Sequence, residues 1–220
     1  MKELTKRGIT STLLGLFTWI SLDYLSPIVF FSFLVLVLLE VLACEWPRFC
    51  KNSPLFWLIT PLYPVLPFTL LLMLSIHPDP AYQQLLFIMF VLVSGHDTGS
   101  FMVGTTYGKH RMAPTISPAK TWEGFFGGCL VSLITMSIIM LMRTKPHGPW
   151  PILIVITLFT CVISVLGDLF ESILKRRAQL KDSGSILPGH GGFLDRFDGI
   201  LFAIFFFYAF KEKLCVLFGA

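Results

Sequence analysis

The sequence predicts an all-α fold, a polytopic transmembrane helical bundle of about seven spans. Of its 220 residues 55% are hydrophobic and only 14% are charged, whereas soluble domains are close to a quarter charged. The apolar residues also fall in long runs, among them 25–44, 55–76 and 125–142. Each run approaches the roughly 20 residues that cross a hydrocarbon layer. The third observation is the placement of Lys and Arg, which gather in loops on one side.

The spans are expected at residues 8–24, 25–44, 54–76, 81–104, 124–142, 150–174 and 197–218. The first follows a basic start but no small-residue cleavage site follows it, so a retained helix is expected and not a cleaved signal peptide. Prolines at 61, 64 and 67 predict kinks in the third span. The last span is interrupted by charged residues at 211–213.

The charge distribution predicts the orientation of the chain. With the N-terminus in the cytoplasm, only Arg143, Lys145, Lys211 and Lys213 fall outside among the 17 Lys and Arg residues. This orientation puts two polar loops, at 109–121 and 177–194, on the side that contains nucleotides. The five cysteines predict neither a disulfide framework nor a zinc site.

The densest polar stretch begins inside the sixth span. On a continuous helix Asp168, Ser172 and Lys175 share one face. A carboxylate at hydrocarbon depth costs about 2.5–3.5 kcal/mol, so it needs a partner or a water-filled cavity. A structural ion pair of Asp168 with Lys175 or Arg176 is an open alternative.

The rest of this stretch favours a site for a metal and phosphates. Glycines at 189, 191 and 192 permit close backbone approach, and Asp195 and Asp198 add carboxylates of the kind that bind Mg²⁺. The basic run 175–177 and Lys181 suit phosphate, although a patch attracted to anionic lipid headgroups is an alternative. His190 is expected to donate a hydrogen bond to phosphate more readily than to act as a general base.

A second polar stretch spans residues 94–124. Asp97 lies near the cytoplasmic end of the fourth span, and glycines at 99, 104 and 108 predict close helix packing. The following loop offers phosphate donors: Lys109, His110, Arg111, Ser117, Lys120 and Thr121. A basic loop that only obeys the charge asymmetry is the alternative. No Walker-type loop, HExxH or GxSxG motif is present, which removes several common enzyme classes.

Together the two stretches resemble the phosphatidate cytidylyltransferase family, also called CDP-diacylglycerol synthases. The family's C-terminal motif is matched by Ser172, Lys175, Arg176, Lys181, Asp182, Pro188, His190, Gly191, Gly192, Asp195, Arg196 and Asp198. The upstream run 116–124 also looks like a family element, with two departures: Ala119 replaces a usual lysine and Thr105 a common basic residue.

The resemblance implies transfer of CMP from CTP to phosphatidate, giving CDP-diacylglycerol and pyrophosphate. It implies catalytic roles for Asp168, Asp195, Lys175 and Lys181, substrate contacts from Ser117, Lys120, Thr121, Ser172, Arg176, His190, Gly191, Gly192 and Arg196, and metal binding by Asp168, Asp195, Asp198 and Asp97. Mg²⁺ is the expected cofactor, and a second ion is left open. Residues 1–80 would be N-terminal membrane helices, and residues 81–220 would carry the active site.

The expected partners are CTP and phosphatidate in the bilayer, with no nucleic acid, and a homodimer is left open. The expected location is the plasma membrane of a bacterium, with the active site on the cytoplasmic face. Three alternatives stay open: a cytidylyltransferase for another lipid phosphate, a CTP-dependent lipid kinase and, remotely, an ion-coupled transporter that uses Asp97 and Asp168.

Overall fold

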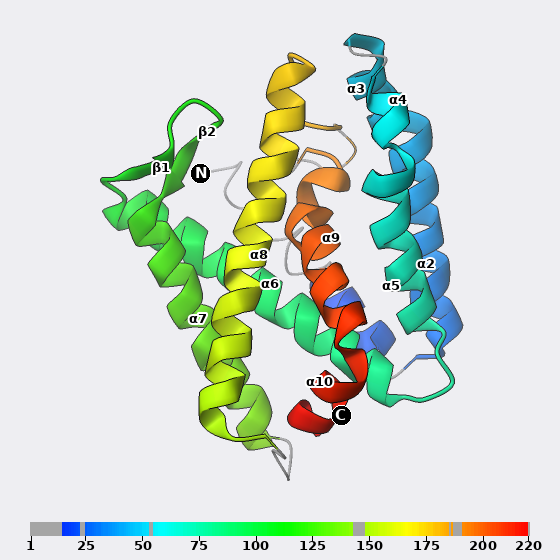
Figure 1. Cartoon of the computed structure of the whole chain (residues 1–220), viewed down its shortest axis with the longest axis vertical. Coiled ribbons are helices and arrows are strands. Elements are labelled where there is room, and N and C mark those ends of the chain that lie inside the picture. Colours follow the sequence, from blue (N-terminus) through cyan, green and yellow to red (C-terminus); the bar gives the residue numbers. More distant parts are fainter. Residues whose placement is uncertain are drawn as a thin grey trace.

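Helices make up nearly all of the computed structural model, which describes residues 15–22, 25–52, 55–142, 148–184, 186 and 191–219 (Figure 1). Residues 15–22 are helical. The elements that follow are α2 (Pro27–Glu40), the π-helical turn η1 (Val41–Glu45), α3 (Trp46–Asn52), α4 (Phe56–Ile59), the π-helical turn η2 (Pro61–Val65), α5 (Leu66–Ser75), α6 (Ala81–Tyr107), β1 (Arg111–Ala113), β2 (Ser117–Thr121), α7 (Trp122–Met142), α8 (Trp150–Arg177), α9 (Leu194–Ala209) and α10 (Lys211–Phe218).

Five helical segments of the described residues are long and apolar enough to cross a membrane. They are Pro27–Lys51, Phe56–Ser75, Ala81–Tyr107, Trp122–Met142 and Trp150–Arg177. Each begins and ends within a few residues of an expected span, except that the first continues seven residues further, through η1 and into α3. The helical bundle is therefore confirmed, whereas the number of seven spans is not.

The two remaining expected spans differ from the prediction for separate reasons. The span at 8–24 falls mostly outside the described residues. The span at 197–218 is divided into α9, with 16 residues, and α10, with eight. The division falls at Phe210, next to the charged residues 211–213, and neither helix has the roughly 20 residues of a full crossing.

The loop expected at 109–121 contains a small antiparallel hairpin of β1 and β2, which is an exception to the all-α prediction. The expected kink in the third span is present at Tyr63, whose φ of −153° and ψ of 117° are extended. The three prolines around it leave backbone carbonyls without their helical donors, which is why the helix bends there.

The bundle packs as helix pairs: α2 with α5, α6 with α7, and α8 with α9, the last lying beside α5 and α6 (Figure 1). Aromatic and aliphatic side chains such as Phe30, Leu34, Phe68 and Phe207 fill the interior without solvent exposure. The α6–α7 pair is especially close. A Cβ atom at Gly99 would lie 2.7 Å from the Val131 side chain and 2.9 Å from the Gly127 carbonyl oxygen, so the predicted packing role of this glycine is confirmed.

Both polar stretches end at the same end of the bundle. The hairpin, the C-terminal end of α8 and helices α3 and α4 lie toward the upper end in Figure 1, whereas α10 and the connection from α5 to α6 lie at the opposite end. The polar side chains of the sequence motifs are thus presented from one end of a membrane bundle.

Candidate active site

The hairpin between α6 and α7 is fixed by its own polar groups. The Glu123 carboxylate accepts hydrogen bonds from the backbone N–H groups of Lys109, at 3.1 Å, and His110, at 3.2 Å. The Thr121 hydroxyl oxygen accepts the N–H of Gly124 at 3.1 Å and so caps the start of α7. Arg176, at the end of α8, donates through Nε to the Ile116 carbonyl oxygen at 3.1 Å. The hairpin is therefore held against the end of α8.

This placement brings Lys120 of β2 to Asp168 of α8, and the two side chains form an ion pair. The side chains are 21% and 31% exposed, so solvent reaches both. The alternative in which Asp168 pairs with Lys175 or Arg176 is wrong about the partner. Asp168 pairs with Lys120 of the hairpin and not with a residue further along α8. The two polar stretches of the sequence meet at this pair.

Lys175 forms the centre of a second, deeper cluster. Its ammonium group donates to the Glu171 carboxylate at 2.9 Å and to the Asp195 carboxylate at 2.7 Å. All three side chains are largely or fully buried. Because a buried charge is costly unless it is paired and hydrogen-bonded, the ammonium and the two carboxylates depend on one another.

Asp195 receives further hydrogen bonds through its second oxygen. The N–H groups of Ser183 and Gly192 donate to Oδ2, each at 2.9 Å, and the Ser183 hydroxyl, which also faces Glu45, lies 2.9 Å from the same oxygen. Burial by itself raises the pKa of this carboxyl, but Lys175 and these donors outweigh it and hold the pKa of Asp195 below its usual value. Asp195 is therefore an anion in a tightly organised loop. Gly191 has a φ of +81°, a backbone conformation that few other residues adopt.

Further acidic groups surround the Lys175–Asp195 pair. Asp198, one turn along α9, is 7% exposed, and Asp168, Glu171 and Asp97 are near enough to repel its negative charge. Two buried oxygens there have no hydrogen-bond partner in the described part of the chain, Glu171 Oε1 and Tyr63 Oη. Buried polar atoms are seldom unpaired. Clustered carboxylates with an unpaired oxygen fit a hard divalent cation such as Mg²⁺.

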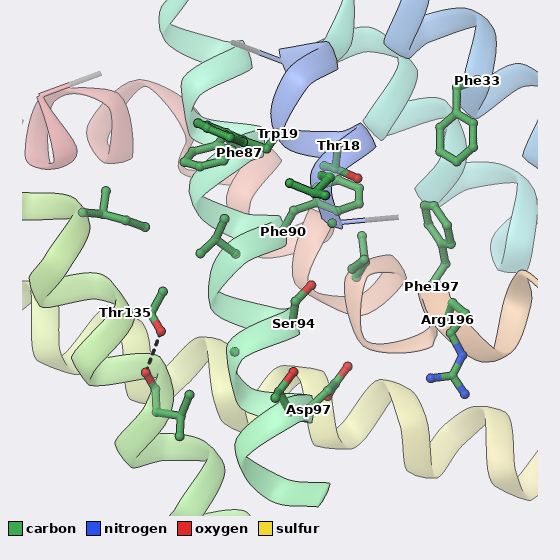
Figure 2. Close-up of a pocket in the computed structure, with 18 of the residues that line it drawn as sticks. Thr18, Trp19, Phe33, Phe87, Phe90, Ser94, Asp97, Thr135, Arg196 and Phe197 are labelled. Atoms are coloured by element: carbon green, nitrogen blue, oxygen red, sulfur yellow. Dashed lines mark hydrogen bonds between the residues drawn. The ribbon is translucent and has the colours of Figure 1, made fainter. Parts of the chain in front are cut away.

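A cavity of about 790 Å³ lies beside the acidic cluster, between α6, α7, α9 and the helical residues 15–22. Aromatic side chains, among them Trp19, Phe87 and Phe90, line one end of it, whereas Asp97 and Arg196 lie toward the other end (Figure 2). A cavity with an apolar end and a charged end fits an amphipathic molecule.

The sequence model of the cytidylyltransferase family matches residues 6–214, nearly the whole chain. This chain belongs to the cytidylyltransferase family. It is 48% identical to the phosphatidate cytidylyltransferase of Bacillus subtilis over 123 residues. These residues make up 56% of this chain and 45% of that protein. The protein of the same name from Staphylococcus epidermidis is 46% identical over 115 residues, 52% of this chain and 44% of its own.

The Haemophilus influenzae phosphatidate cytidylyltransferase is 37% identical over 168 residues, which are 73% of this chain and 58% of that protein. The chain thus spans about half the length of the curated relatives it matches. The motif at residues 172–198 therefore identified the family correctly.

The structure brings together most of the residues that resemblance to the cytidylyltransferase family implies. Asp195 and Lys175 form an ion pair at the junction of α8 and α9, Asp168 and Asp198 lie near enough there to repel each other's charge, and Asp97 and Arg196 line the adjoining cavity. Buried Ser172, positive-φ Gly191 and buried Gly192 belong to the same junction.

The other residues that the resemblance implies make contacts within the chain or lie on the loops, and their expected contacts with substrate stay predictions. Thr121 uses its hydroxyl as a helix cap, Arg176 binds a backbone carbonyl, and Ser117 lies at the start of β2. Lys181 is exposed on the loop after α8. His190 lies outside the described residues.

Sequence reasoning missed two residues that the structure places at the site of this family member. Glu45, from η1, and Ser183, from the loop before α9, both take part in its hydrogen bonds. A signal for Glu45 was present, because an acidic residue directly after the apolar run 25–44 is expensive to bury without a purpose.

Three buried ligand-type residues also meet away from the acidic cluster: His96, Cys129 and Cys161 have ligand atoms within 4.8 Å of one another. They come from α6, α7 and α8, so no spacing in the sequence revealed them. Three groups are one short of the four that a structural zinc ion takes, and His96 Nε2 already lies 3.3 Å from the Ser100 hydroxyl. We assign the cysteines a packing role, in which a buried thiol acts as a small apolar group.

Proposed function

We propose that this chain transfers CMP from CTP to phosphatidate, releasing pyrophosphate and leaving CDP-diacylglycerol in the bilayer. The observation that carries the proposal is the adjacency of the acidic and basic cluster to the cavity. The cavity has an aromatic end suited to acyl chains and a charged end, with Asp97 and Arg196, that faces the junction of α8 and α9. The names of the relatives support the same substrates.

The reaction joins two anionic substrates. An oxygen of the lipid phosphate forms a bond to the α-phosphorus of CTP, and the bond from that phosphorus to the bridging oxygen of the β-phosphate breaks, so that pyrophosphate leaves. The lipid supplies the nucleophile, and the protein needs to position the substrates and to neutralise charge. This requirement explains a site made of carboxylates, cations and glycines without a serine or cysteine nucleophile.

We propose roles for Arg196, Lys120 and Lys175 on the basis of their positions. Arg196 lines the cavity and is exposed there, so it is placed to bind the phosphate of a lipid whose acyl chains lie among the aromatic residues. Lys120, at the outer end of the cluster, is placed to bind a phosphate of CTP. Lys175 keeps the charges of Glu171 and Asp195 balanced and their carboxylates oriented.

Asp168, Asp195 and Asp198 are the residues that we propose to hold Mg²⁺, with Asp97 and Glu171 beside them. Bound there, Mg²⁺ supplies positive charge that offsets the repulsion between the two phosphate groups. We place the site on the cytoplasmic face of a bacterial plasma membrane, because CTP is cytoplasmic and 13 of the 17 Lys and Arg residues fall on the same side of the predicted spans as the polar loops.

The purified chain in detergent tests this proposal when it is given CTP and phosphatidate. We expect CDP-diacylglycerol and one pyrophosphate per turnover, and loss of both when Mg²⁺ is chelated. Release of CDP without pyrophosphate indicates a lipid kinase instead. Turnover with an isoprenoid ether lipid phosphate, but not with phosphatidate, indicates a different lipid substrate.

A further inference from the structure

The buried carboxylate of Glu45 connects the N-terminal helices to the start of α9. Glu45 is the last residue of η1 and is 1% exposed. Its Oε1 accepts the backbone N–H of Phe193 at 2.6 Å, and its Oε2 accepts the N–H of Leu194 at 3.0 Å and the Ser183 hydroxyl at 2.7 Å. These partners are 138 to 149 residues away along the chain.

The physical reason for this arrangement lies in the end of a helix. The first N–H groups of an α-helix have no acceptor within the helix, and the partial positive charge of that end favours an anion. Phe193 is the N-cap residue of α9 and Leu194 is its first helical residue. The phenyl side chain of Phe193 has no oxygen that could accept a hydrogen bond from these N–H groups. Glu45 supplies the missing acceptor from another helix, and the three donors offset the cost of burying its charge.

The same loop holds Asp195. The Ser183 hydroxyl lies between the two carboxylates, 2.7 Å from Glu45 and 2.9 Å from Asp195, and its single proton is donated to one of them at a time. Gly192 donates its N–H to Asp195, and a Cβ atom at Gly192 would lie only 2.3 Å from Glu45 Oε1. The backbone at 192 thus passes between the two acids, and only a glycine leaves room for it.

Arg48, about one turn after Glu45, holds the same loop from the other side. Its guanidinium donates to the Ser183 carbonyl oxygen at 2.7 Å. The hydroxyl and the carbonyl of Ser183 are thus bound by two residues from the end of the same membrane helix. The position of the loop therefore depends on residues far upstream of the family motif at 172–198.

We propose that Glu45 is a positioning residue of the active site, which orients Asp195 by holding Ser183 and the first turn of α9. Glu45 donates nothing to a substrate and acts through Asp195. The proposal rests on the proposed function of Asp195, and it gives the N-terminal membrane helices a part in the chemistry beyond anchoring the chain.

The test compares Glu45→Gln with Glu212→Gln, a matched control on the exposed first turn of α10 at the other end of the bundle. Glutamine keeps the size of Glu45 and one acceptor oxygen, but it turns an NH₂ group toward a donor. We expect Glu45→Gln to lower kcat by about 10- to 100-fold, as loss of a group that supports a metal ligand does. The KM for CTP should change less than twofold, and the Mg²⁺ concentration for half-maximal rate should rise.

A second readout is independent of turnover. Hydrogen–deuterium exchange of peptides that cover residues 191–197 should become faster in Glu45→Gln and stay unchanged in Glu212→Gln. Exchange across α6 and α7 should stay the same in both variants. If Glu45→Gln does not fold, Ser183→Ala takes its place, because it removes the bridging hydroxyl and keeps the two backbone donors to Glu45. A several-fold loss of kcat is then expected.

The outcomes separate this proposal from the proposed function. Wild-type protein that makes no CDP-diacylglycerol overturns the function, while exchange at 191–197 still tests the role of Glu45. An active wild type with unchanged kcat and exchange in Glu45→Gln overturns the positioning role. Faster exchange throughout the bundle, with kcat lost only in proportion to unfolded protein, also overturns it, because Glu45 would then stabilise the fold alone.

Discussion

Ion pairs at the site differ in how far they are buried, and this difference decides what each side chain can do. The Lys120–Asp168 pair is partly exposed, so water screens it and its net contribution to stability is about 0–1 kcal/mol. The Lys175–Asp195 pair is deeply buried, and removal of one partner strands the other at a cost of about 3–5 kcal/mol. Asp168 is therefore the aspartate whose chemistry can be tested without loss of the fold.

We expect Asp168→Asn to abolish Mg²⁺-dependent pyrophosphate release, with a loss of about 100-fold or more, and to leave thermal stability in detergent nearly unchanged. Asparagine keeps the size and one acceptor but not the charge that binds a divalent cation. Parallel assays of pyrophosphate and of thermal unfolding check this. Near-normal turnover at limiting Mg²⁺ would remove Asp168 from the ligand set.

Lys120 stands next to Ala119, where the family usually has a second lysine, and so it is expected to carry the phosphate contact alone. We expect Lys120→Ala to raise the KM for CTP several-fold with no change in thermal stability, because an exposed pair stabilises little. Lys51→Ala removes the same charge from an exposed position in the last turn of α3, outside both motif loops, and serves as the control. If the two variants have the same KM for CTP, Lys120 does not bind CTP and contributes only to the charge difference between the two sides of the membrane.

Among the elements, α6 and α7 determine where the hairpin and Lys120 lie, because the hairpin joins these two helices. Their close approach depends on glycines that face the neighbouring helix, as in other small-residue helix contacts in membranes. Lateral separation of α6 from α7 would move Lys120 relative to Asp168 on α8. Packing far from the chemistry thus controls the geometry of the site.

Gly99→Ala should lower the thermal stability of the protein, because the added methyl group meets both a side chain and a backbone carbonyl of α7. Overpacking of this kind costs about 1–3 kcal/mol. Gly15→Ala is the control, since a Cβ atom there meets nothing within 4 Å. Thermal unfolding in one detergent compares them. An unfolding temperature of Gly99→Ala equal to that of Gly15→Ala would show that the two helices can separate freely.

At the scale of the whole molecule, the motif loops share one end of the bundle and α10 lies at the other (Figure 1). The cavity extends from the acidic cluster into the apolar interior, so a substrate with a charged head and apolar chains can reach both regions at once. This arrangement matches a reaction between a water-soluble nucleotide and a lipid.

Labelling of single cysteines tests which end faces the cytoplasm. In a variant without the five native cysteines, cysteines at Thr115 and Arg177 should react with a membrane-impermeant thiol reagent only after the cells are opened, whereas a cysteine at Glu212 should react in intact cells. The reason is the concentration of Lys and Arg in the loops at the motif end. Labelling of Thr115→Cys from outside would reverse the orientation.

The sequence by itself determined the membrane class, the approximate limits of four of the five long helices of the described residues, and the family. The length of an apolar run indicates where a helix enters and leaves the hydrocarbon layer. The motif residues at 168–198 lie close enough along the chain to be recognised together. It also indicated that Asp168, Ser172 and Lys175 share a face, because helical periodicity is local.

Only the tertiary structure decided which charges meet. Lys120 reaches Asp168 from a hairpin because α7 packs against α8, and Glu45 reaches Phe193 from 148 residues away because α5 packs against both α2 and α9. No local spacing encodes such contacts. Only the structure showed that residues 197–218 form two helices and not one span, although the charged residues 211–213 had marked the place of the division.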